Sequence, residues 1–114
     1  MMTRRPALLL FLAGLVLPIG ASAQNISIAT GGTGGVYYPL GGGMANILTK
    51  HVPGWQATAE VTGASVANLQ LIGQGKQDVG FTMADVAWDA FKGQGKFATG
   101  AVGARTLIVL YPNK

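Results

Sequence analysis

The stretch that decides the fold runs from Asn25 to His51 and reads NISIATGGTGGVYYPLGGGMANILTKH. Its first five residues alternate between polar and apolar side chains, which is typical of a short strand. A glycine-rich loop follows from Thr30 to Gly35, and the chain from Val36 onward carries apolar side chains near helical spacing. The stretch therefore predicts a strand, a glycine loop and a helix in that order.

The same order recurs further along the chain. Residues 56–61 alternate like a strand, and a second helix is expected from Ser65, which is a plausible N-cap, to a stop at Gly73. Residues 79–83 are short and apolar, which predicts a third, buried strand, and residues 84–91 predict a third helix. The sequence thus contains three strand–turn–helix units.

After the third helix we expect an irregular loop over residues 92–103, and then a buried strand over residues 106–110. This last run, Thr-Leu-Ile-Val-Leu, is of the kind that is buried on both faces of a parallel sheet. Strands that alternate with helices imply right-handed crossovers, so the fold class is α/β, a mostly parallel sheet with flanking helices. Ligands bind such sheets beyond the carboxyl ends of the strands, where residues 30–35, 62–65 and 82–85 should meet.

The N-terminus is predicted to be an export signal. Arg4 and Arg5 precede an apolar run at residues 7–17, and Ala21-Ser22-Ala23 fits the small-x-small pattern of a signal peptidase site. As a helix the run would be roughly 16 Å long, too short for a hydrocarbon core of about 30 Å. We therefore expect residues 1–23 to be removed, residues 24–114 to be the mature part of the chain, and the protein to lie in the periplasm, with the Sec and twin-arginine routes both open.

Composition excludes several classes of protein. The chain has 114 residues, which is one modest domain, and no cysteine, which rules out zinc–thiolate sites, iron–sulfur clusters and disulfides. The formal charge of +4 falls to +2 without Arg4 and Arg5, and the remaining cations are scattered, so nucleic acid is not an expected partner. The aspartates are too far apart in sequence to predict a metal cluster, and no cofactor is expected.

The glycine loop has two possible roles. It leads directly into a helix whose first amides lack internal partners, which suits a carboxylate or a phosphate. It could equally be a turn that only lets strand and helix pack. Both nucleotide motifs fail here, because Gly35 is followed by Val36 where a P-loop needs lysine, and Tyr37 stands where the dinucleotide pattern needs glycine.

Ser65 and Asp85 are ambiguous from sequence. The segment around Ser65 approaches a nucleophile elbow but lacks its final glycine, and the sole histidine, His51, is expected at the far end of the first helix. A helix cap or a ligand hydroxyl is therefore favoured for Ser65 over a nucleophile. Asp85 follows the third strand, where it could meet a ligand ammonium group or cap its own helix.

Three segments resemble one family in order. Residues 28–39, Ile-Ala-Thr-Gly-Gly-Thr-Gly-Gly-Val-Tyr-Tyr-Pro, are similar to the opening of the mature TAXI proteins, the solute receptors of TRAP transporters. Residues 62–69 resemble the family's Thr-Gly-Gly-Ser-x-x-Asn-Leu segment, and residues 77–81 its Ala-Asp-hydrophobic-Gly-Phe segment. Ala64 departs from the glycine that is usual in the second segment, which puts a close backbone approach there in doubt.

The resemblance implies a partial first lobe of a two-lobed binding protein that captures a small organic acid or amino acid, glutamate-like, and delivers it to a TRAP membrane subunit. It implies no catalysis. Carried over by motif, the ligand-binding residues are Thr33, Gly34, Gly35, Tyr37, Ser65, Asn68 and Asp85. Two readings from other classes stay open: a small exported serine hydrolase that uses Ser65, and a self-contained exported interaction domain whose glycine loop is structural.

Overall fold

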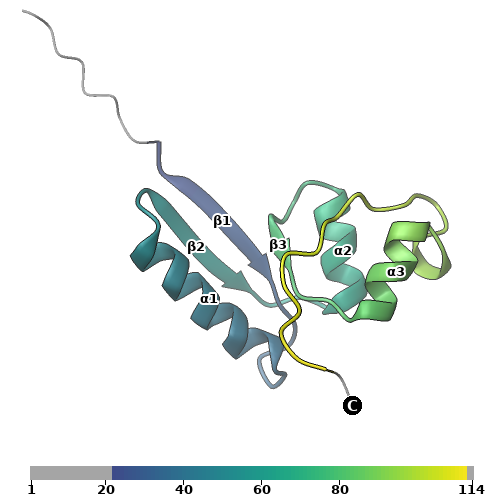
Figure 1. Ribbon diagram of the computed structural model, residues 1–114, viewed down its shortest axis with the longest axis horizontal. Coiled ribbons are helices and arrows are strands. Elements are labelled where there is room, and N and C mark those ends of the chain that lie inside the picture. Colours follow the sequence, from purple (N-terminus) through teal and green to yellow (C-terminus); the bar gives the residue numbers. More distant parts are fainter. Residues whose placement is uncertain (1–21, 113–114) are drawn as a thin grey trace, which may run out of the picture.

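The computed structural model describes residues 22–112, which fold around a three-stranded parallel sheet (Figure 1). The strands are β1 (Gln24–Ala29), β2 (Trp55–Glu60) and β3 (Val79–Gly80), in the order β2-β1-β3. Ile28 of the central strand pairs with Ala59 on one side and Val79 on the other. The expected α/β class with a parallel sheet is confirmed. Nearly all of the predicted export signal, residues 1–21, lies outside the described residues.

Three helices flank the sheet (Figure 1): α1 (Tyr37–His51), α2 (Ser65–Gly73) and α3 (Ala84–Lys92), followed by the short 3-10 helix η1 (Gly95–Phe97). These bounds confirm the three predicted helices, and η1 lies within the segment that was expected to be irregular. Within residues 22–112, none of these helices has the length and apolar character that a membrane crossing requires.

Two apolar clusters hold the molecule together. In the first, Ile26 and Ile28 of β1 pack with Ala45 of α1 and with Phe81. In the second, Leu69 of α2 packs with a buried set from α3 and the chain after it: Ala90, Phe97 and Val102. Because neighbouring residues of a strand point to opposite faces, Ala29 is buried on the α2 side while Ile28 is buried on the α1 side.

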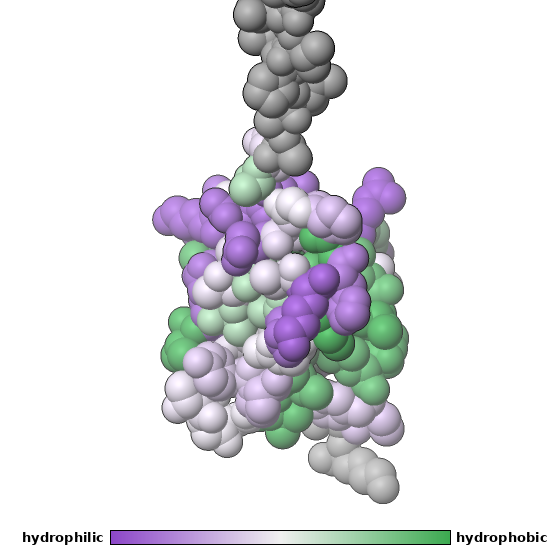
Figure 2. All heavy atoms as spheres, turned by 90° about the vertical axis from the view of Figure 1, so that its left-hand side faces the viewer, coloured by the Kyte–Doolittle hydropathy of each residue, from purple (hydrophilic) through white to green (hydrophobic). Residues whose placement is uncertain are grey.

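The prediction of a buried strand at residues 106–110 is wrong. This segment forms no strand in the structure, and Leu107 and Val109 are 77% and 82% exposed. The physical reason is that no described strand pairs with it and no described helix covers both of its faces; Leu110 alone reaches a cavity against α1. The apolar side chains of this segment therefore lie on the outside of the molecule. Figure 2 shows that one face of the molecule carries apolar surface as well as hydrophilic side chains.

The third strand is also shorter than residues 79–83. Only Val79 and Gly80 have strand geometry, although the amide of Phe81 still donates to the carbonyl of Ala29 at 3.0 Å. Beyond Phe81 the chain turns away from β1 to enter α3. The second strand begins one residue earlier than predicted, at Trp55.

Candidate functional site

Three loops leave the sheet at the carboxyl ends of its strands, as the sequence predicts. They are residues 30–36 after β1, residues 61–64 after β2 and residues 81–83 after β3. The first is bonded to the end of β2, because both the amide and the hydroxyl of Thr30 donate to the carbonyl of Glu60, at 3.0 and 2.6 Å. Thr30 itself is fully buried, so this end of the first loop is fixed.

Asn68, from the first half of α2, is bonded to all three loops. Its side-chain amide donates to the carbonyls of Thr30 and Phe81, each at 2.7 Å, and to that of Ala29 at 3.2 Å. Its side-chain oxygen accepts from the hydroxyl of Thr62. Asn68 has no exposed surface, so the polar group that the motif singled out lies beneath the loops. Its assignment to the ligand stays a prediction.

The middle of the glycine loop presents main-chain amides at the surface. Gly35 donates to the carbonyl of Gly32 at 3.0 Å, which closes a turn and uses one amide. Among residues 22–112 no hydrogen bond is found for the amides of Thr33 and Gly34, and both residues are exposed. The next segment, α1, begins without a side-chain cap at Val36 and without an acidic residue in its first turn. An anion at this point would therefore meet uncompensated amide hydrogens and the positive end of the helix dipole.

The space outside the loop is open. A Cβ atom built on Gly34 would meet no atom of the chain within 4 Å, and one on Gly35 would meet only the carbonyl of Gly32, at 3.4 Å. Tyr37 lies at the start of α1, half-buried, with its ring centre 5.3 Å from that of Phe81. The tyrosine thus supports the first loop from the apolar core while part of it remains accessible.

Ser65 does not cap its own helix. It is the first residue of α2, and the N-cap is Ala64, so the prediction of an N-cap at Ser65 is wrong. The hydroxyl oxygen of Ser65 instead accepts from the amide of Met83 at 3.1 Å, because it is turned toward the third loop. Ser65 is buried, and it joins the second and third loops beside the bonds of Asn68.

Asp85 is an exposed residue in the first turn of α3. Its carboxylate accepts from the amide of Val86 at 2.8 Å, and no hydrogen bond joins it to another of the predicted site residues. A carboxylate at this position also interacts favourably with the N-terminus of its helix. The structure therefore gives Asp85 a local partner, and its assignment to the ligand stays a prediction.

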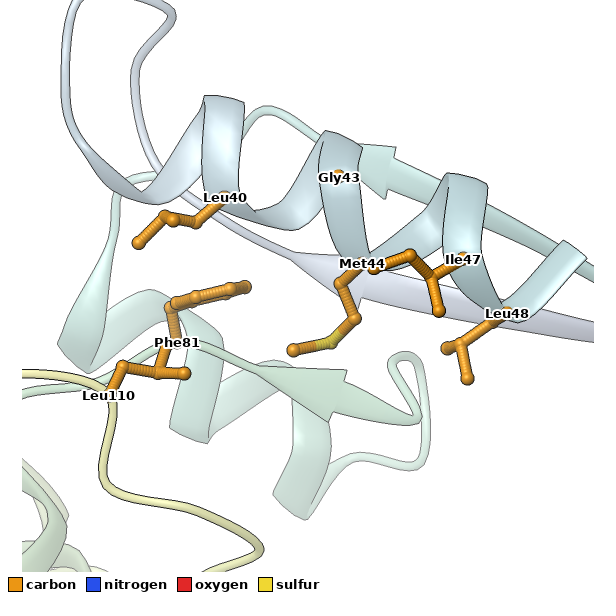
Figure 3. Close-up of a pocket in the computed structure, with 7 residues that line it drawn as sticks. All are labelled: Leu40, Gly43, Met44, Ile47, Leu48, Phe81 and Leu110. Atoms are coloured by element: carbon orange, nitrogen blue, oxygen red, sulfur yellow. The ribbon is translucent and has the colours of Figure 1, made fainter. Parts of the chain in front are cut away.

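A second hollow lies away from the predicted residues. It is an apolar cavity of about 300 Å³ between α1 and Phe81, where the side chains of α1 point toward Phe81 and Leu110 (Figure 3). The lining residues are Leu40, Gly43, Met44, Ile47, Leu48, Phe81 and Leu110. Such walls suit an apolar side chain and offer no partner to a carboxylate. The sequence did not reveal this cavity, because it depends on where residue 110 comes to lie.

Within the described range 22–112, no three histidine, aspartate, glutamate or cysteine side chains gather as they would around a metal ion. At the carboxyl edge of the sheet, the exposed part of the first loop offers the amides of Thr33 and Gly34, and the ring of Tyr37 lies beside that loop. In a comparison with known protein families, residues 28–114 of this chain match the NMT1-like family. The matched range begins at the end of β1 and takes in all three loops.

Proposed function

The chain belongs to the NMT1-like family, whose members are substrate-binding proteins of the periplasmic type, and from that premise we propose that it is a ligand-capturing lobe of a TAXI-type receptor. The ligand is a small organic acid or amino acid, glutamate-like, and the recipient is the membrane subunit of a TRAP transporter in the inner membrane. The protein acts in the periplasm, after removal of residues 1–23, and performs no catalysis. It needs no cofactor.

The observation that carries this proposal is the pair of free, exposed amides at Thr33 and Gly34, directly before α1. A carboxylate placed there accepts hydrogen bonds that the protein does not otherwise use, and it is favoured by the helix dipole. Gly34 has open space around it, so a ligand can approach the main chain closely. The hydroxyl of Thr33 adds a further donor on the same loop.

A binding protein of this kind closes a second lobe over the ligand, which excludes water and completes the hydrogen bonds. The three loops described here form one wall of such a site. This wall is open to solvent, so we expect it to bind a carboxylate with an affinity on the order of millimolar or weaker when it is alone.

Two features support the absence of catalysis. Ser65 is buried, and its hydroxyl oxygen accepts from a main-chain amide. His51, the sole histidine, is the last residue of α1, whose first residue follows the glycine loop. Because a helix of this length spans about 22 Å, His51 lies far from the end of α1 that follows the glycine loop. We therefore favour the receptor over the serine hydrolase.

The test is an NMR titration of the full chain with sodium succinate and L-glutamate. We expect the amide signals of Thr33, Gly34 and Gly35 to shift with both, and to stay in place with succinamide, which has the same carbon skeleton but no charge. Gly34→Ala should weaken the response about tenfold without loss of stability, because its methyl group occupies the ligand's space and touches nothing in the protein. Gly42→Ala, which adds the same methyl group on an exposed turn of α1, is the matched control.

Three results would count against the proposal. Identical shifts with succinamide would mean that charge is not recognised. If Gly34→Ala responds to the carboxylates as the wild type does, the ligand does not bind against Gly34. No response to any carboxylate, together with cooperative unfolding of the chain, would favour the reading in which the glycine loop is structural and the protein is an interaction domain.

A further inference from the structure

Asn68 has a polar side chain with no exposed surface, and each of its hydrogen-bond partners is a main-chain carbonyl or a hydroxyl group. Burying an amide is unfavourable unless its hydrogen bonds are made. The two hydrogens of its amide are shared among three carbonyls, and its oxygen accepts from Thr62. Both ends of the amide group are thus bonded within the protein, and the side chain presents no surface to the solvent.

The partners of Asn68 lie far apart in sequence. The carbonyls of Ala29 and Thr30 end β1, and the carbonyl of Phe81 follows β3. One side chain is therefore bonded to both the first loop and the third loop. The bond from Thr62 adds the second loop to the same group.

The second loop contains a strained residue that these bonds hold in place. Ala64 has φ +66° and ψ −150°, a conformation that is favourable for glycine alone. Its amide donates to the hydroxyl oxygen of Thr62 at 3.1 Å, and its carbonyl accepts from the amide of Asn68 at 2.8 Å. Because Thr62 is itself bonded to the side chain of Asn68, the turn is closed from both sides.

We propose that Asn68 is a positioning residue: it fixes the three loops relative to one another, and the ligand depends on it through the loops and not by contact. The effect on the ligand rests on the proposed function, whereas the positioning of the loops does not. This role differs from the direct contact between Asn68 and the ligand that the resemblance implies. Loss of the side-chain amide leaves the carbonyls of Thr30 and Phe81 without their donor, so the first and third loops should open separately.

The test is amide hydrogen exchange followed by NMR in the full chain, with Asn68→Asp as the variant. Aspartate has the same shape but lacks the amide donors. The reporter amides are those of Thr30 and Phe81, which donate to the last residues of β2 and β1, and the reference amides are those of Val52 and Gln74, which close the ends of α1 and α2. We expect exchange of the reporters to rise at least about tenfold relative to the references.

Asn46→Asp, the same change at an exposed position of α1, is the matched control and should alter neither set. If Asn68→Asp does not fold, Thr62→Val removes the hydroxyl group that bonds to Asn68 and to the amide of Ala64, with little change of shape, and Thr62→Ser restores it. We expect the reporter amides to exchange faster in Thr62→Val and to exchange at close to the wild-type rate in Thr62→Ser. Equal acceleration of reporters and references, or no acceleration, would overturn the positioning role.

The dependence of ligand binding on Asn68 is tested with sodium succinate as the probe. If the wild-type chain responds to succinate, Asn68→Asp should weaken that response about tenfold, and an unchanged response alongside faster reporter exchange would overturn this dependence. If the wild-type chain does not respond, the proposed function fails, while the exchange rates still decide whether Asn68 holds the loops. The two failures are therefore distinguishable.

Discussion

The methyl group of Thr30 occupies the place that a side chain at Gly41 would need, since a Cβ atom built on Gly41 would overlap with Thr30 Cγ2. Gly41 is buried in the second turn of α1, where the helix crosses the carboxyl end of β1. The same Cβ atom would lie 3.4 Å from the ring of Phe81 and 3.6 Å from Ala59. The glycine therefore lets the helix lie close to the strands at the edge where the candidate site is formed.

Gly41→Ala should destabilise the chain by about 1–3 kcal/mol, because the packed neighbours must shift to admit one methyl group. The measurement is the midpoint of urea unfolding. Gly42→Ala should instead stabilise by about 0.5–1 kcal/mol, since a Cβ at that exposed helical position meets nothing and alanine has less chain entropy to lose. Equal effects of the two substitutions would contradict the close approach of α1.

Ala64→Gly should stabilise the chain. The φ and ψ angles of Ala64 belong to a region whose strain is of order 1–3 kcal/mol for a residue with a side chain. Glycine removes that strain and adds about 0.5–1 kcal/mol of chain entropy to be lost on folding. The net expectation is a gain of about 0.5–2 kcal/mol, seen as a higher urea midpoint with an unchanged slope.

Ala67→Gly, at a half-buried position inside α2, is the control for that substitution and should destabilise, because glycine is unfavourable in a helix interior. If both changes lower stability, the turn at Ala64 carries no strain.

The sequence predicted the elements because their signals are local. Glycine pairs end strands and helices, and alternation or helical spacing is visible within a dozen residues, as in the stretch from Asn25 to His51. The convergence of the loops followed from the parallel sheet alone. The length of β3 could not be predicted, because the composition of residues 81–83 is compatible with a strand although the chain turns there toward α3.

The roles of individual side chains could not be predicted where they depend on contacts between residues that are distant in the sequence. The bond from Asn68 to Thr30 spans 38 positions, and nothing local distinguishes a buried asparagine from one that faces a ligand. The hydroxyl of Ser65 was expected to cap its helix or to bond to a ligand; it does not cap the helix, and it accepts from Met83, 18 residues away. The apolar run at residues 106–110 shows the opposite limit, since its composition matches a buried strand and its position in the described chain leaves it exposed.

That exposure makes a prediction for Val109. Val109→Thr should change stability by no more than about 0.5 kcal/mol, because the side chain is already in water. Ile28→Val, which removes one methylene group from a side chain with no exposed surface, should lower stability by about 0.5–1.5 kcal/mol. Thermal unfolding of both variants is the measurement, and a larger loss at Val109 than at Ile28 would show that residues 106–110 are packed in solution.

The carboxylate of Asp78, just before β3, gives a prediction for pH. It accepts from both the amide and the hydroxyl of Ser27 on β1, each at 2.8 Å. These bonds, the one from the amide first, lower the pKa of Asp78 below its ordinary value. A lowered pKa in the folded state means that the charged form is favoured by folding, so the contribution to stability is complete above the unfolded pKa of about 3.9 and is lost as the pH falls through the folded value.

Asp78→Asn should therefore be less stable than the wild type at pH 7, and the gap should close as the pH falls below about 4. Urea unfolding at a series of pH values from 7 to 3 measures this gap. Ser27→Ala keeps the amide donor and loses the hydroxyl, so it should retain the larger part of the pH dependence, in keeping with the order of the two causes. If the difference in unfolding free energy between the wild type and Asp78→Asn stays constant over the whole pH range, the charge of Asp78 does not contribute to stability.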